Sequence, residues 1–135
     1  MEKIIWSEKY SVGHEHFDEQ HQAIIDLINQ LIELQGKPFD KAAVREINSD
    51  LVKYGMEHLR DEETLLQENN YPEFLKHKSE HILYVKKTTK YLKNTIDINE
   101  ETLSQIIEFL ADWWTHHILE EDMKYKPFLE NIGTN

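Results

Sequence analysis

The stretch "HLRDEETLLQENNYPEFLKHKSEH", residues 58–81, decides the fold, because it joins two helical patterns through one short break. His58 and Glu62 stand four residues apart, and so do His77 and His81. A spacing of four places both members of a pair on one face of a helix. The intervening "NNYP" contains residues typical of a turn between helices. The sequence therefore predicts two helices, each presenting a pair of metal-ligand side chains.

Apolar residues recur at helical spacing along the rest of the chain as well. Asp18 is a suitable N-cap for a first helix, and Pro72 suits the first turn of a third. Short connections make successive helices antiparallel. A further short helical turn is expected after Pro127. We therefore expect an all-α protein, an up-down-up-down antiparallel four-helix bundle in a single domain of residues 1–135, with a non-helical N-terminal arm over residues 1–17 and helices over about residues 18–36, 40–69, 72–94 and 99–121.

The composition excludes several classes of function. The formal net charge of −11 argues against nucleic acid as a partner. Without cysteine, the chain has neither disulfides nor thiolate metal ligands. The sequence has no apolar run long enough to span a bilayer, and its N-terminus does not resemble a signal peptide. We therefore expect a cytoplasmic protein that does not insert into a membrane.

Histidines and carboxylates interrupt the apolar faces of all four predicted helices. In an up-down-up-down bundle, the starts of the first and third helices share one end of the molecule with the ends of the second and fourth. At a rise of roughly 1.5 Å per residue, these polar side chains fall within roughly two turns of one level. They are His21, His58, Glu62, His77, His81 and His117, with Asp122 following where the fourth helix should be ending.

Such a polar cluster inside a bundle needs partners, because buried polar groups without them are costly. A bound metal would supply them. Five imidazoles and two carboxylates are too many donors for one tetrahedral zinc ion, but they suit two octahedral iron ions bridged by the carboxylates. The sequence therefore predicts a dinuclear iron centre.

Four segments carry a family resemblance. "DEQH" (18–21), "HLRDEE" (58–63), "HKSEH" (77–81) and "HHILEED" (116–122) resemble the hemerythrin family. The flanking "YSVG", "YPEFLKH" and "EEDMKYKPF" are similar to those of single-domain bacterial hemerythrins. The resemblance covers nearly the whole chain and fills all seven ligand positions of the family.

This resemblance implies a ligand set and a function. In this family, three histidines hold one iron and only two hold the other, so the second iron keeps an open position. There the family binds dioxygen reversibly, for delivery, storage or sensing rather than for catalysis. Dioxygen is the implied partner, and no protein partner follows from the sequence. By resemblance, His77, His81 and His117 hold one iron, His21 and His58 hold the other, and Glu62 and Asp122 bridge the pair together with an oxo or hydroxo group.

Four residues are expected to border the oxygen pocket: Leu59, Trp113, Trp114 and Ile118. The family usually has leucine where this chain has Trp114, and often phenylalanine where it has Leu59. A larger and a smaller side chain on the two sides could conserve the volume of the pocket. If the indole N–H turned inward, it would donate a hydrogen bond to the bound ligand. The alternative is that both residues only pack the core.

Enzyme functions stay open as alternatives. Redox chemistry on peroxide or nitric oxide would use the same di-iron site. "HKSEH" also matches the zinc-peptidase pattern H-x-x-E-H, with His77 and His81 as ligands and Glu80 as general base. That reading leaves five further donors unexplained. A ferritin-like oxidase is disfavoured, because no histidine here follows a glutamate by three residues.

Several polar residues fall outside the pattern. His14 and His16 could chelate a surface metal, but we expect them to be solvated, because the predicted arm offers no rigid element to fix them. His116 lies about 100° around the helix from its neighbour and should point away from the site. Glu63 is expected at the solvated surface.

Overall fold

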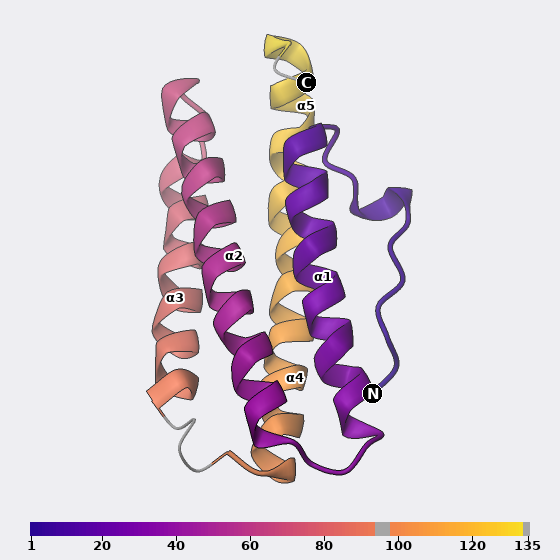
Figure 1. Cartoon of the computed structure of the whole chain (residues 1–135). Coiled ribbons are helices and arrows are strands. Elements are labelled where there is room, and N and C mark those ends of the chain that lie inside the picture. The colour runs from indigo at the N-terminus through magenta and orange to yellow at the C-terminus, as the bar shows by residue number, and fades with distance from the viewer. Residues whose placement is uncertain (94–97, 134–135) are drawn as a thin grey trace.

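The computed structural model describes residues 1–93 and 98–133, and every regular element among them is helical. Four long helices run alternately up and down as an antiparallel bundle (Figure 1), which confirms the predicted fold class. The elements are the 3-10 turn η1 (Glu8–Tyr10), α1 (Glu15–Gln35), α2 (Lys41–Glu68), α3 (Phe74–Lys93), α4 (Glu100–His116), the π-helix η3 (His117–Asp122) and α5 (Met123–Ile132).

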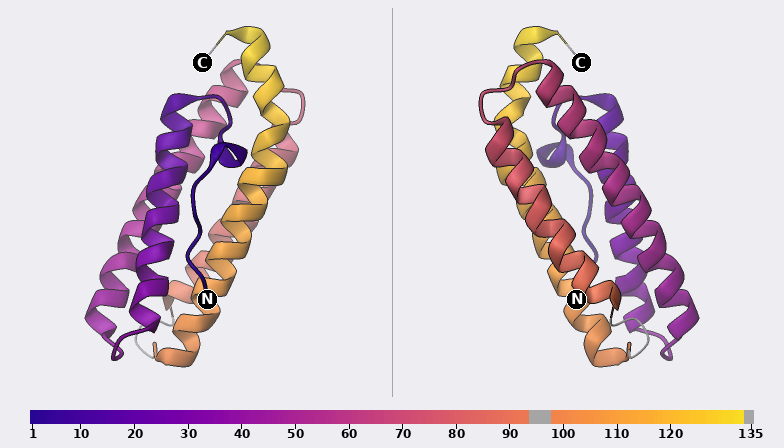
Figure 2. Two further views of the ribbon diagram at one scale, coloured as in Figure 1. Left: turned by 90° about the vertical axis from the view of Figure 1, so that its right-hand side faces the viewer. Right: turned by 90° about the vertical axis from the view of Figure 1, so that its left-hand side faces the viewer.

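The N-terminal arm runs antiparallel to α1 and lies between α1 and α4 (Figure 2). Asn29 holds it through two hydrogen bonds of 2.8 Å with the backbone of Ile4, one donated by each residue. Ile4 and Trp6 also pack against the core. The arm therefore covers the side of the bundle between its first and fourth helices.

The start of α1 differs from the sequence prediction. The helix begins at Glu15, and His14 caps it by accepting a hydrogen bond from the Phe17 amide. Asp18, the expected cap, instead accepts hydrogen bonds from the Ser11 hydroxyl at 2.6 Å and the Val12 amide at 2.9 Å. Its carboxylate is used to tie the arm to the helix, so capping falls to the residue four positions earlier.

The break between α2 and α3 also differs in detail. Asn70 adopts a left-handed backbone with φ of 58°, a conformation that asparagine tolerates at helix ends. The Tyr71 amide then donates to the Leu66 carbonyl at 2.9 Å, which closes α2. Pro72 lies in the following turn, and α3 begins at Phe74 rather than at the proline. The helix end expected at residue 94 lies outside the described residues.

The fourth helix extends further than expected. Helical structure continues from α4 through η3 into α5 and ends at Gly133, whose φ of 71° is a left-handed C-cap. Pro127, expected before a separate turn, lies within α5. At the other end, Asn99 and Thr102 form a reciprocal capping box that fixes the start of α4.

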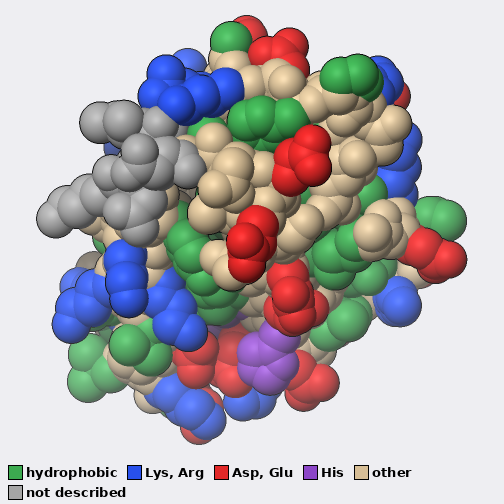
Figure 3. Space-filling model, turned by 90° about the horizontal axis from the view of Figure 1, so that it is seen from below, with side chains coloured by type: hydrophobic (Ala, Val, Ile, Leu, Met, Phe, Trp, Pro, Cys, Tyr) green, Lys and Arg blue, Asp and Glu red, His purple; other side chains and the backbone are tan. Residues whose placement is uncertain are grey.

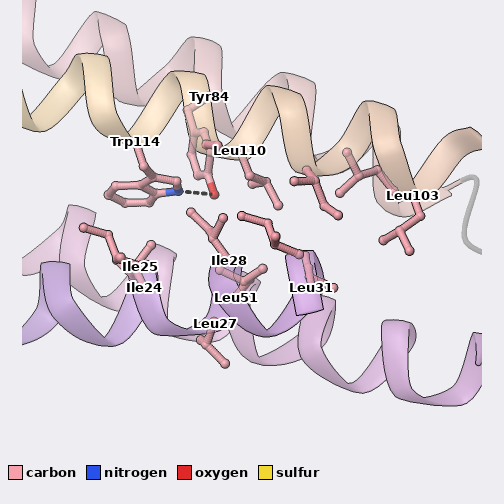
Figure 4. Packing of buried hydrophobic residues seen from close by; sticks show 14 of the residues in the cluster. Ile24, Ile25, Leu27, Ile28, Leu31, Leu51, Tyr84, Leu103, Leu110 and Trp114 are labelled. Carbon is pink, nitrogen blue, oxygen red and sulfur yellow. Dashed lines mark hydrogen bonds between the residues drawn. The ribbon is translucent and has the colours of Figure 1, made fainter. Parts of the chain in front are cut away.

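Two apolar clusters fill the bundle on either side of one level. Along α1, Phe17 belongs to one cluster and Ile24 to the other, with His21 between them. Along α2, Leu66 and Leu59 divide in the same way. The larger cluster lies toward the C-terminal end of α1 and the N-terminal end of α2, and part of it is drawn in Figure 4. The histidines therefore occupy a polar layer between two dry regions.

The outer surface contrasts with this interior. Acidic and basic side chains are interspersed with apolar ones over the end of the bundle seen from below (Figure 3). Within the described ranges, none of the helices combines the length and the apolar character needed to cross a membrane.

Candidate metal centre

All seven residues of the predicted ligand set meet in the polar layer. Each has an exposed fraction of at most 3%, so water does not satisfy their polar atoms. The starts of α1 and α3 and the C-terminal part of α2 lie level with the end of α4, as the antiparallel topology requires (Figure 1). The residues are His21 on α1, His58 and Glu62 on α2, His77 and His81 on α3, and His117 and Asp122 at the two ends of η3.

The potential ligand atoms form two overlapping sets. Within each set, one nitrogen or oxygen from every residue lies within 4.8 Å of the others. Glu62 belongs to both sets, so it is common to the two potential metal positions. One contains Glu62, His77, His81 and His117, and the other contains His21, His58, Glu62 and Asp122.

Glu62 divides its two oxygens between these sets. Its Oε1 contacts Nε2 of His77 and lies 3.1 Å from Nε2 of His81 and 3.6 Å from Nε2 of His117. Its Oε2 lies 3.1 Å from Nε2 of His58. The carboxylate therefore extends from one histidine group to the other.

Asp122 makes the same division from the opposite helix. Its Oδ1 lies 3.2 Å from Nε2 of His77 and 3.0 Å from Nε2 of His117, whereas its Oδ2 lies 3.1 Å from Nε2 of His21. Despite these distances, neither oxygen has a hydrogen-bond partner among the described residues. The two Asp122 oxygens therefore lie against imidazole nitrogens without hydrogen bonds to them. Bound cations between these atoms would supply the missing partners.

The π-helix explains how Asp122 reaches the centre. In an α-helix, residues five apart point about 140° away from each other. In a π-helix, bonding from i to i+5 brings them to one face. His117 and Asp122 begin and end η3, so both side chains face inward. From its sequence, the helix was expected to be ending here, but its turn widens instead.

The electrostatics of the metal-free cluster favour charged groups. Burial alone would raise the pKa of Glu62 and Asp122, but the neighbouring histidines outweigh it and hold both pKa values well below the usual range. Burial alone would lower the pKa of His77 and His117, but the two carboxylates raise these pKa values to about 10 and about 9. For His58, burial and the adjacent His21 lower the pKa.

Two supporting residues were missed by the sequence reading. The Tyr125 hydroxyl, fully buried, donates to Oε2 of Glu62 at 2.9 Å. Gln20 accepts a hydrogen bond of 2.6 Å from Nδ1 of His58 through its Oε1. Both residues fall within the segments that carry the family resemblance, but their spacing alone gives no indication of these contacts. Glu63, expected in solvent, lies with one oxygen 3.4 Å from Nδ1 of His81.

The predicted oxygen-pocket residues lie beside this centre. Leu59, Trp114 and Ile118 are buried, and Trp113 is half-buried with its ring stacked on His117 at 4.4 Å. The Trp114 ring lies 5.9 Å from the ring of His58.

The Trp114 N–H turns away from the metal centre. The indole donates a hydrogen bond of 3.1 Å to the Tyr84 hydroxyl (Figure 4), so it does not point at the metal centre. Trp114 therefore presents the carbon surface of its ring to the histidines.

The remaining polar residues from the sequence reading lie outside the centre. Glu80 is only partly buried and belongs to neither set of ligand atoms. His116 is exposed. His14 caps α1, and His16 pairs with Asp61 at 3.2 Å on the surface. None of these groups contributes to the seven-residue cluster.

A four-helix bundle with five inward histidines and two shared carboxylates defines a class, the metal-binding helical bundles. Residues 12–129 match the family model described as "Hemerythrin HHE cation binding domain". A bacteriohemerythrin from Stenotrophomonas maltophilia is 30% identical over 93% of this chain and 80% of its own length. A myohemerythrin from Riftia pachyptila is 29% identical over 90% of each chain.

The structural comparison agrees. A solved structure of wild-type hemerythrin superimposes with a TM-score of 0.81 at 26% identity, over 92% of this chain and 95% of that one. The chain belongs to the hemerythrin family.

Proposed function

We propose that this protein binds dioxygen reversibly at a pair of iron ions held by the seven buried residues. One observation carries the proposal: each carboxylate turns one oxygen toward each of the two histidine groups. Carboxylates with both oxygens directed to different cation positions are typical of bridging ligands in dinuclear centres. Three imidazoles and two carboxylates on one side, and two of each on the other, exceed what a single ion needs.

The proposed ligand roles follow from this division. The side with two histidines has one fewer protein donor, so the proposed open position for a small ligand lies there, beside Trp114. We assign His77, His81 and His117 to one iron, His21 and His58 to the other, and Glu62 and Asp122 to both, with an oxo or hydroxo group completing the bridge.

The chain's own residues would set the conditions for reversible binding. When bound, a ferrous pair supplies the two electrons that dioxygen takes up and returns. Leu59, Trp114 and Ile118 surround the histidines with carbon surface and exclude water, which slows proton entry. Tyr125 holds Glu62 in place through its hydrogen bond. These residues bind and shield rather than transform a substrate, which supports a binding protein over an enzyme.

The alternatives lack an observation in their favour. Peroxide or nitric oxide chemistry would use the same seven residues, so the ligand set does not favour it over reversible binding. A zinc peptidase would need Glu80 at the centre, yet this residue belongs to neither set. Delivery, storage or sensing of oxygen, a single domain and a cytoplasmic location stay predictions from the sequence.

The test is a visible spectrum of the iron-loaded protein, reduced without air and then exposed to it. Colour should appear with dioxygen and disappear when the gas is removed, and metal analysis should give two irons per chain. Colour that does not reverse would contradict reversible binding, and a single zinc ion would contradict the di-iron centre. His117→Ala should abolish the colour, while His116→Ala, which alters the exposed neighbour on the same helix, should retain it.

A further inference from the structure

A line of polar side chains leads from His58 to the surface between α1 and α2. Nδ1 of His58 donates to Oε1 of Gln20 at 2.6 Å. Nε2 of Gln20 in turn donates to Oδ2 of Asp61 at 2.8 Å. Nε2 of His16 lies 3.2 Å from the same oxygen, with His16 largely exposed. The line therefore connects a buried imidazole of the centre to solvent through one amide and one carboxylate.

The proton position on His58 decides whether this residue can bind a metal. A neutral imidazole carries one N–H, and only the other nitrogen has a free lone pair. Nε2 of His58 faces the centre, 3.1 Å from Oε2 of Glu62 and 2.8 Å from Nε2 of His21. Metal binding through Nε2 therefore requires the proton to stay on Nδ1.

Gln20 can favour either proton position, depending on its orientation. With Oε1 toward His58, the amide accepts from Nδ1–H and stabilises the required tautomer. Rotated by about 180°, it would present N–H to Nδ1 and stabilise the tautomer with the proton on Nε2. The amide alone does not choose between these states, because it carries both a donor and an acceptor.

Asp61 removes this ambiguity. An ionised carboxylate only accepts hydrogen bonds, so it selects the orientation in which Gln20 donates to it. The reversed amide would set its oxygen against a carboxylate oxygen and lose the hydrogen bond to Asp61. We infer that Asp61 is a positioning residue: it orients the Gln20 amide, and the amide keeps the Nε2 lone pair of His58 directed at the metal centre. This inference rests on the proposed metal-binding function of His58.

The test compares three single variants of the full-length, metal-free protein. Asp61→Leu removes the acceptor, Asp61→Asn replaces the acceptor-only carboxylate with an amide that can also donate, and Gln20→Leu removes the amide of Gln20. One measurement is the tautomer of His58 from its imidazole 15N shifts without metal. The other is the affinity for Co²⁺ by calorimetric titration. Neither measurement uses iron or dioxygen, so its outcome is independent of whether oxygen binding is reversible.

Asp61→Leu should populate both tautomers of His58 and weaken binding of one Co²⁺ per chain by about 10-fold or more, the usual effect of losing a residue that orients a ligand. Asp61→Asn, whose amide can turn either an oxygen or an N–H toward Gln20, should also populate both tautomers and weaken binding. Gln20→Leu should match Asp61→Leu, and combining both changes should add nothing. Glu57→Leu, which removes an exposed acid one turn earlier on α2, should have no effect.

Three outcomes would overturn the inference. If Asp61→Asn kept the Nδ1–H tautomer of His58 as fully as the carboxylate does, an acceptor-only group would not be what orients Gln20. If Asp61→Leu had the same effect with and without Gln20, the carboxylate would act independently of the amide. If Asp61→Leu left the tautomer of His58 unchanged, Gln20 would need no orienting partner.

Discussion

Metal binding to the metal-free protein should release about two protons at pH 7, one from His77 and one from His117. Their pKa values of about 10 and about 9 lie about three and about two units above that pH, so both imidazoles start protonated. A metal ligand must lose its proton. At about 1.4 kcal/mol per unit, binding at pH 7 is opposed by about 7 kcal/mol relative to the deprotonated site. Glu62 and Asp122, whose pKa values are lowered, are already ionised and release nothing.

The same pKa shifts predict that the stability of the metal-free protein and its affinity for metal change with pH in opposite directions. A histidine with a raised pKa stabilises the metal-free fold fully below its unfolded pKa of 6.5, and this contribution is lost as pH rises through the folded value. The metal-free protein should therefore lose stability between pH 6.5 and about 10. Over the lower part of this range, metal affinity should rise by about two orders of magnitude per pH unit, because two protons are displaced.

The assay is an anaerobic calorimetric titration with Fe²⁺ in buffers of different ionisation enthalpy, repeated from pH 7 to 9. The slope of observed enthalpy against buffer enthalpy gives the number of protons released. Fewer than one proton per chain, or an affinity that does not change with pH, would refute the reasoning. His116→Gln, which alters an exposed histidine, should leave the proton count unchanged.

Three further predictions concern single side chains near the centre. Tyr125→Phe deletes the buried hydrogen bond to Glu62 and should lower the free energy of unfolding by about 1.5–3 kcal/mol in urea denaturation of the metal-free protein; an unchanged midpoint would contradict the importance of that contact. Trp114→Leu should autoxidise faster and bind azide more readily while keeping both irons. Trp114→Phe should be intermediate, because the indole shields the site by its bulk while its N–H is bonded to Tyr84. Unchanged autoxidation and azide binding in both variants would mean that Trp114 only packs the core. Glu80→Ala should alter neither iron content nor the oxygenated spectrum, and loss of either with an intact fold would restore a chemical role for that carboxylate.

The sequence was sufficient to predict the bundle and to select the seven buried polar residues. Helical spacing identifies which side chains share a face, and the alternation of helix direction identifies which ends meet. His21 and His117 could therefore be placed together although 95 positions separate them, since both facts depend only on position along a helix. The seven are buried and adjacent, as that argument requires.

What the sequence did not supply are contacts that depend on one atom's direction. The hydrogen bond from Tyr125 to Glu62 and that from His58 to Gln20 cross between helices, so helical spacing does not reveal them. The Trp114 ring could have been turned so that its N–H pointed toward the histidines or away from them, and the hydrogen bond to Tyr84 fixes it pointing away. The widened turn of η3 was likewise hidden, because it depends on local backbone geometry rather than on which residue types recur.

The widened turn of η3 also sets the direction around the helix axis in which each later side chain points. On an ideal α-helix, Tyr125 would sit about 80° around the axis from His117, toward one side of the bundle. Because the π turn absorbs one residue, the two side chains return to within about 20° of each other, and Leu129 falls in line with them. Tyr125 and Leu129 are indeed both buried, with exposed fractions of 0% and 3%. The π turn thus contains one residue more than an α-helical turn needs. A single deletion within residues 118–121 should therefore convert it to a normal α-helical turn. A deletion just after Asp122 should instead rotate the rest of the helix and turn its buried side chains out of the core.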